Sequence, residues 1–148
     1  MGKDTTKTFS TMIPADLGFS ALSRKMSTAL FEQLGLGDKE IFRLVLVVDE
    51  LFMNAVKYGS DESSSVHLDF SFIAGELLTV VIEDEGKGDK CCASELKEKM
   101  ALEFQHHSPD KTSGRGLAQI ALNLTDSFEI EDSQYGGIKI TFTKSLKV

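Results

Sequence analysis

The spacing of apolar residues is most regular between residues 38 and 59. There, apolar side chains recur every three or four residues, as they do along one face of an α-helix. The stripe consists of Ile41, Leu44, Val45, Val48, Phe52 and Ala55. Asp38 stands before it, where it can act as an N-cap, and Gly59 can supply a left-handed stop. The pattern predicts one amphipathic helix from Asp38 to Gly59.

The N-terminal part of the chain predicts a strand and another helix. Residues 7–13 mix β-branched and aromatic side chains and stop at Pro14, which indicates a strand near a sheet edge. A helical repeat of apolar residues then ends at Gly35. This repeat consists of Leu17, Leu22, Met26, Ala29, Leu30 and Leu34. A short linker joins the two predicted helices, so we expect them to pack on a common surface.

The chain beyond residue 65 predicts further strands. Residues 66–72 alternate between apolar and polar side chains, so this strand should bury one face and turn His67 towards solvent. Residues 77–84 are almost continuously apolar, which is typical of a central strand, and they follow a turn that makes a hairpin. A last hairpin is predicted across residues 134–137. Its apolar positions are Phe128, Ile130, Ile138, Ile140 and Phe142.

Length and charge narrow the function classes. A chain of 148 residues with 41% hydrophobic composition fits one domain with a single core. Its formal net charge of -7 argues against binding nucleic acid or an anionic membrane by bulk electrostatics. No apolar run approaches the ~20 residues of a membrane span. The two cysteines are adjacent, and we interpret them as free thiols in a reducing compartment. We therefore expect a cytoplasmic protein that meets any anionic ligand locally.

Polar side chains gather on the other side of the helix 38–59. At about 100° per residue, Glu50, Asn54 and Lys57 fall close together and roughly opposite the apolar stripe. An Asn carbonyl is a suitable magnesium ligand, and Glu50 can accept a proton from a hydroxyl or water that attacks a metal-bound phosphate. A solvated helix face is the plainer explanation of the same three residues.

Two glycine-rich stretches add candidate phosphate contacts. Asp84 ends the central strand and is followed by Gly86 and Gly88, which could also serve only a turn. Another predicted helix opens with Ser113, Gly114, Arg115, Gly116 and Leu117. Backbone N–H groups at such a helix N-terminus can bind phosphate oxygens, although Ser113 could be a simple N-cap. The polar stretch 89–112 between them predicts a long loop with a short helix.

In order and spacing, these motifs resemble the ATP-binding domains shared by gyrase, the ninety-kilodalton heat-shock chaperone, sensor histidine kinases and the MutL proteins. ELFMNAVKYG (50–59) is similar to the N box, DEGKG (84–88) to the first glycine box and SGRGL (113–117) to the second. The compact form most resembles the anti-sigma-factor serine/threonine kinases. The resemblance covers nearly the whole chain and implies an α+β fold, a two-layer sandwich of a mixed β-sheet with helices packed on one face.

The resemblance also implies roles for the matched positions. It makes Glu50 the general base, Asn54 the magnesium ligand and Lys57 a phosphate contact, while Asp84 would accept a hydrogen bond from the adenine amino group. The other matched residues would contact or approach the nucleotide: Gly86, Gly88, Ser113, Gly114, Arg115, Gly116 and Leu117. Residues 89–112 would form a lid over it.

The chain departs from the family pattern beside these motifs. Asp89 follows the first glycine box, where an apolar residue is usual, and Tyr58 stands where these kinases often carry histidine. Ile138 follows the final glycine pair, where related domains often have a threonine near the adenine. The lost hydroxyl is expected to weaken or alter recognition of the nucleotide without abolishing phosphate binding.

The function implied by the resemblance is a protein kinase that uses ATP and magnesium. Such kinases phosphorylate a serine of a small antagonist protein and alternatively sequester a sigma factor. The alternative is a binding module that uses nucleotide only to set its shape while it holds a partner, and the presence of Glu50 favours the enzyme. A detached histidine-kinase domain ranks last because no dimerisation helix with a phosphoacceptor histidine precedes the domain. The sequence leaves a homodimer open.

Overall fold

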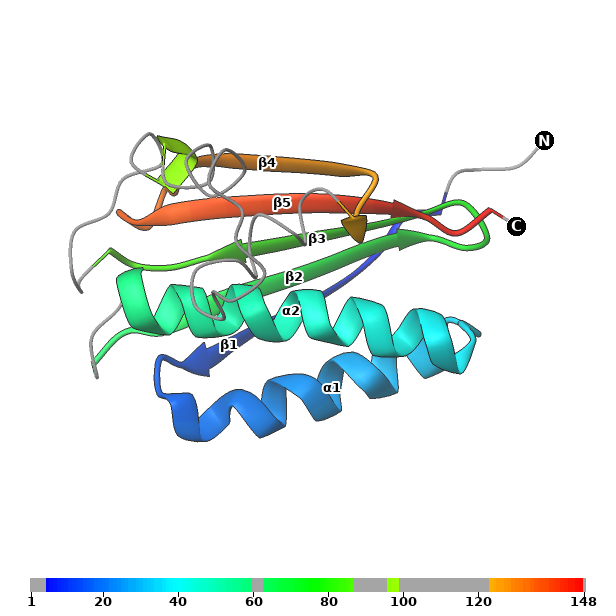
Figure 1. Ribbon diagram of the computed structural model, residues 1–148, viewed down its shortest axis with the longest axis horizontal. Helices are drawn as coiled ribbons and strands as arrows, with labels where there is room; N and C mark the ends of the chain where they lie inside the picture. Colours follow the sequence, from blue (N-terminus) through cyan, green and yellow to red (C-terminus); the bar gives the residue numbers. More distant parts are fainter. Residues whose placement is uncertain (1–4, 60–62, 87–95, 99–122, 148) are drawn as a thin grey trace, which may run out of the picture.

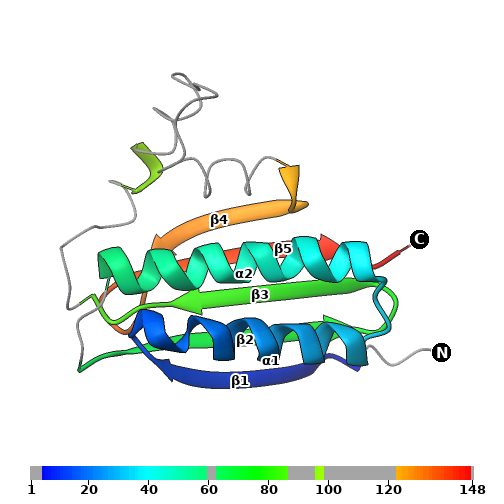
Figure 2. The ribbon, with the colours of Figure 1, turned by 60° about the horizontal axis from the view of Figure 1, so that its bottom comes forward.

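The structure, a computed structural model, describes residues 5–59, 63–86, 96–98 and 123–147. These residues form two layers, a five-stranded sheet and two long helices that cover one of its faces (Figure 1, Figure 2). The elements are β1 (Lys7–Pro14), a short 3-10 helix η1 (Leu17–Phe19), α1 (Ser20–Gln33), α2 (Asp38–Gly59), β2 (Ser65–Ile73), β3 (Leu77–Glu83), β4 (Ser127–Asp132) and β5 (Ile138–Ser145). The predicted α+β fold with helices on one sheet face is confirmed.

The sheet has the order β1-β2-β3-β5-β4, with β1 at an edge and β3 in the centre, as predicted. A mixed sheet was expected, but all four pairings of the described strands are antiparallel. The helical hairpin explains the difference, because α1 and α2 run side by side in opposite directions (Figure 2). The chain therefore returns to the end of β1 before it begins β2, and Ala15 N donates to Ser64 O at 3.0 Å.

The core lies between the sheet and α2. The helix begins and ends at the predicted residues, Asp38 and Gly59, and its predicted apolar stripe faces the core. Val47 and Leu51, which were not in the predicted stripe, are also fully buried and widen the packed face. Neither long helix, nor any other in the described part of the chain, offers the length of apolar sequence that crossing a membrane requires.

Helix α1 forms where it was predicted, but only part of the predicted apolar repeat lies on its buried face. Leu22 is exposed, and Leu17 lies outside α1 in the preceding 3-10 turn. The most buried residues of α1 are Ser23, Ser27 and Phe31. Small serine side chains let two helices approach closely, and Ser27 Oγ satisfies itself by donating to Ser23 O at 2.8 Å. Of the predicted apolar repeat, Met26, Leu30 and Leu34 pack against the core, whereas Leu22 and Ala29 are exposed. The prediction missed Ser23 and Ser27 because it counted only apolar residues as a packing face.

The turn between the helices is a Schellman motif. Leu36 N donates to Phe31 O at 3.2 Å and Gly35 N donates to Glu32 O at 3.0 Å, which is the paired pattern of this helix end. Gly35 takes the left-handed conformation that the motif requires, with φ of 79°. Because a side chain at Gly35 would meet no atom within 4 Å, the cost of any substitution there comes from the backbone alone.

We expect Gly35→Ala to lower the free energy of unfolding by about 1 kcal/mol, the cost of a left-handed alanine. Gly35→Asn should lose less, because asparagine tolerates this conformation better than alanine does. Urea unfolding of both variants measures the difference. Equal losses would show that the left-handed backbone at Gly35 is not what the turn requires.

Candidate functional site

Asp84 lies directly after β3, at the end of the central strand. Its backbone continues the pairing with β5, because Asp84 N donates to Ile138 O at 3.1 Å. Its side chain is buried, and Oδ1 accepts two backbone hydrogen bonds, from Gly86 N at 3.0 Å and Ile138 N at 3.2 Å. Both bonds fall on Oδ1, so Oδ2 is the oxygen that can accept a hydrogen bond from a ligand. The backbone thus orients a single buried acceptor.

Glycines allow the hairpin between β4 and β5 to touch this carboxylate. A Cβ atom on Gly137 would overlap Asp84 Oδ1, and one on Gly86 would overlap the carbonyl of Gly136. Gly86 also has a φ of 67°, which a residue with a side chain rarely adopts. The sequence pattern predicted Gly136 and Gly137 only as a hairpin turn. Their contact with Asp84 and Gly86 is an additional role that the structure reveals.

Burial makes Asp84 an unusually basic carboxylate. Desolvation raises its pKa from 3.8 to about 6, and the charge of Glu83 adds to the rise. The hydrogen bonds from Ile138 and Gly86 act in the opposite direction because they stabilise the ionised form. Asp84 is therefore ionised at neutral pH but lies close to protonation. A ligand N–H group directed at Oδ2 would stabilise the charged form further.

Helix α2 carries the other described site residues. Glu50 and Asn54 are half-buried, one helical turn apart, and Lys57 is exposed. Burial raises the pKa of Glu50, and the neighbouring charge of Asp49 raises it further. Asp49 itself pairs with Arg24 of α1 at 3.0 Å. The affinity of Glu50 for a proton is thus increased, and the half-buried amide of Asn54 lies one helical turn away.

The fold brings the two groups of residues to one end of the molecule. The C-terminal end of α2, which holds Asn54 and Lys57, lies at the same end as the C-terminal end of β3, after which Asp84 follows (Figure 1, Figure 2). Among the described residues, no three His, Cys, Asp or Glu side chains gather to hold a metal ion. The amide oxygen of Asn54 is a donor of the kind that magnesium accepts alongside phosphate oxygens and water.

The rest of the predicted site lies outside the described residues. This applies to Gly88 and Asp89, and to Ser113, Gly114, Arg115, Gly116 and Leu117. Of the predicted lid at residues 89–112, the structure describes only residues 96–98. These are helical, and Leu96 is buried in the core cluster, at a position where the sequence suggested a short helix.

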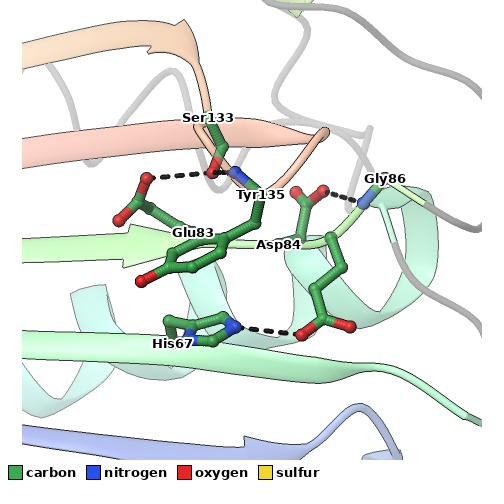
Figure 3. A network of polar contacts seen from close by, with 7 residues as sticks. His67, Glu83, Asp84, Gly86, Ser133 and Tyr135 are labelled. Atoms are coloured by element: carbon green, nitrogen blue, oxygen red, sulfur yellow. Dashed lines mark hydrogen bonds and ion pairs between the residues drawn. The ribbon is translucent and has the colours of Figure 1, made fainter.

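A polar network on the opposite face of the sheet was not predicted (Figure 3). Val66 and Leu68 face the core, so His67 between them lies on the face away from the helices, called the open face below. His67 is on the expected face but is not solvated, because only 13% of its side chain is exposed. Its Nε2 lies 3.0 Å from Glu85 Oε2, and its ring stacks on Tyr135. The alternation of β2 could place His67 on a face, but nothing in the sequence pairs it with Tyr135.

The comparisons with known proteins agree with this fold. No curated protein sequence matches the chain. A family model described as a histidine kinase-like ATPase domain matches residues 13–144. The match covers most of the chain, from the end of β1 to the end of β5, and includes α2 and Asp84. The chain belongs to the family of histidine kinase-like ATPase domains.

Proposed function

We propose that this chain is an ATP- and magnesium-dependent protein serine/threonine kinase of the anti-sigma-factor type. The observation that carries the proposal is Glu50, a half-buried carboxylate with a raised pKa that lies one helical turn from Asn54. A carboxylate with a raised pKa is a stronger base towards an attacking hydroxyl while it still ionises. Family membership supports ATP as the nucleotide, and the resemblance of the compact chain to anti-sigma-factor kinases supports a serine as the acceptor.

Each described site residue has a task in this proposal. Asp84 accepts a hydrogen bond from the adenine amino group through Oδ2, which its two backbone bonds leave available. Asn54 holds magnesium together with phosphate oxygens, and Lys57 contacts the phosphates. Glu50 takes the proton of the acceptor hydroxyl. Bound ATP and magnesium would supply the γ-phosphoryl group and the positive charge that neutralises it during transfer.

The partners in this proposal follow from the resemblance. The phosphoacceptor would be a serine of a small antagonist protein, and a sigma factor would bind the same kinase as the alternative partner. A non-catalytic regulatory module is the second candidate function. It shares the base-binding carboxylate Asp84 but makes no use of a basic carboxylate at Glu50. Proton transfer at Glu50 therefore separates the two candidates.

We expect Glu50→Gln to reduce phosphoryl transfer by at least about 100-fold, because the amide cannot accept the proton. Its dissociation constant for ATP should change by less than about threefold, since Glu50 has no task in holding the nucleotide. The assay follows labelled phosphate from ATP with magnesium to candidate antagonist proteins, and ATP binding is titrated separately. Glu32→Gln, an exposed position at the end of α1, is the matched control. Tight ATP binding by the unmodified chain without transfer or hydrolysis would favour the binding module.

The raised pKa of Asp84 predicts a pH dependence of ATP binding. The ionised carboxylate accepts from the adenine amino group more strongly than the protonated acid does, and Asp84 gains its proton as the pH falls through about 6. ATP affinity should therefore fall progressively below pH 6 and stay nearly constant between pH 7 and pH 8. Titrations of ATP across this range measure the effect. An affinity that does not change down to pH 5 would contradict a base-binding role for Asp84.

Asp84 should also make the ligand-free fold less stable at neutral pH. Its folded-state pKa of about 6 lies above the unfolded value of 3.8. The contribution of Asp84 to folding stability is therefore complete at pH values below 3.8 and is lost as the pH rises through about 6. Asp84→Asn keeps the Oδ1 acceptor but cannot ionise. At pH 8 we expect the free energy of unfolding of this variant to exceed that of the unmodified chain by about 1 kcal/mol, a value reduced to allow for partial screening by water. The difference should be smaller at pH 4. Thermal and urea unfolding at both pH values measure the gain in stability. Titration with ATP tests whether the same variant loses nucleotide binding.

A further inference from the structure

Three side chains form a compact group through contacts with His67, which Figure 3 shows beside Tyr135. His67 Nε2 lies 3.0 Å from Glu85 Oε2, and the rings of His67 and Tyr135 stack with centroids 3.9 Å apart and planes 7° from parallel. The side chains of His67 and Glu85 are only 13% and 21% exposed. We call His67, Glu85 and Tyr135 the clamp.

The clamp joins three parts of the sheet that are separate in the sequence. His67 belongs to β2, Glu85 follows β3, and Tyr135 lies in the hairpin between β4 and β5. Because β3 runs between β2 and β5, Tyr135 must reach past the end of β3 to stack on His67. Side chains from β2 and from the β4–β5 hairpin thus meet at the end of β3.

The hairpin that carries Tyr135 is fixed through its backbone as well. Ser133 Oγ donates to Glu83 Oε1 at 2.9 Å and accepts from Tyr135 N at 3.0 Å. These bonds connect the start of the hairpin to Glu83, the last residue of β3, whose side chain lies on the open face (Figure 3). Both the main chain and the ring of Tyr135 are therefore held in place.

The clamp acts on the two elements that orient the Asp84 carboxylate. Glu85 stands between Asp84 and Gly86, so its bond to His67 sets the direction of the turn from which Gly86 N donates to Asp84. Tyr135 directly precedes Gly136 and Gly137, which pack against Gly86 and Asp84. A shift of either element by a few tenths of an ångström would move a donor away from Oδ1.

We propose that His67, Glu85 and Tyr135 are positioning residues that fix the Asp84 carboxylate for recognition of the nucleotide base. The inference rests on the proposed function, in which Asp84 accepts from the adenine amino group. In this proposal the clamp acts on the nucleotide through Asp84 and not by direct contact. It sets affinity for adenine through the turn and hairpin that hold Asp84.

The test compares Tyr135→Ala, which removes the stacked ring, with Tyr135→Phe, which keeps it. Each variant is titrated with ATP and with inosine triphosphate, which carries an oxygen in place of the adenine amino group. Tyr135→Ala should weaken ATP binding about tenfold and inosine triphosphate binding less than about twofold, because inosine triphosphate lacks the amino group that Asp84 accepts from in this proposal. Tyr135→Phe should bind both nucleotides as the unmodified chain does. An equal loss for both nucleotides, or no loss for ATP, overturns the proposal.

Ser71→Ala is the matched control for a general loss of sheet stability. Ser71 lies on the open face of β2, where its Oγ is 3.1 Å from Thr8 Oγ1 and the pair is remote from the end of β3. We expect this variant to lower the unfolding temperature without changing the preference for ATP over inosine triphosphate. A preference reduced as much as in Tyr135→Ala would overturn the assignment to the clamp.

Amide hydrogen exchange without nucleotide separates this inference from the proposed function. The amides of Gly86 and Ile138 donate to Asp84, so they report directly on its position. Both should exchange faster in Tyr135→Ala than in Tyr135→Phe. An unmodified chain that binds no ATP would overturn the proposed function, and the exchange rates would still decide whether the clamp fixes Asp84. Equal exchange rates in the two variants overturn the proposal.

Discussion

The site depends on one ionisable group that is held in a place unfavourable to its charge. Asp84 is buried at the end of the central strand, and desolvation raises its pKa to about 6. Two backbone N–H groups, from Gly86 and Ile138, offset part of this cost by donating to the same oxygen. The carboxylate therefore stays ionised at neutral pH, and Oδ2 does not take part in these two backbone hydrogen bonds. A fully solvated carboxylate would need no such support but would distinguish one ligand from another poorly.

This arrangement constrains the residues around it. Gly137 has no room for a side chain because Asp84 Oδ1 occupies that space, and Gly86 approaches the carbonyl of Gly136 too closely for any Cβ atom. The β4–β5 hairpin therefore contacts Asp84 through its backbone, at Gly137 and at the N–H group of Ile138. Such a close backbone contact needs restraint of the hairpin from elsewhere. The stacking of Tyr135 on His67 and the bond from Ser133 to Glu83 supply it on the open face.

The sequence predicted those features that depend on periodicity and missed those that depend on contacts between distant segments. Helix α2 has the predicted bounds because its apolar repeat is long and a glycine ends it. Helix α1 buries Ser23 and Ser27, which a search for apolar stripes cannot find because serine is polar. Of the candidate site, Asp84 could be predicted from its place at the end of a strand.

The supporting interactions of the site could not be predicted in the same way. Tyr135 and His67 are far apart in the sequence, and each has an ordinary local explanation as a turn residue and a strand residue. Their pairing follows from the order of the strands, in which β5 lies beside β3 although β4 precedes it in the chain. Only the assembled sheet shows that a ring from the last hairpin reaches β2. The strand order was therefore the missing information.

The buried carboxylate of Asp84 and the half-buried carboxylate of Glu50 differ in what their raised pKa values would accomplish in the proposed site. Glu50 gains affinity for a proton, which in the proposed function would serve a base that removes one from a hydroxyl. For Asp84 the same effect would be a cost, because the proposed acceptor of the adenine amino group is strongest when it is ionised. Backbone hydrogen bonds to Asp84 counteract that cost, whereas the charge of Asp49 beside Glu50 reinforces the rise there. Burial alone would treat both groups alike, so their immediate neighbours determine the separate roles.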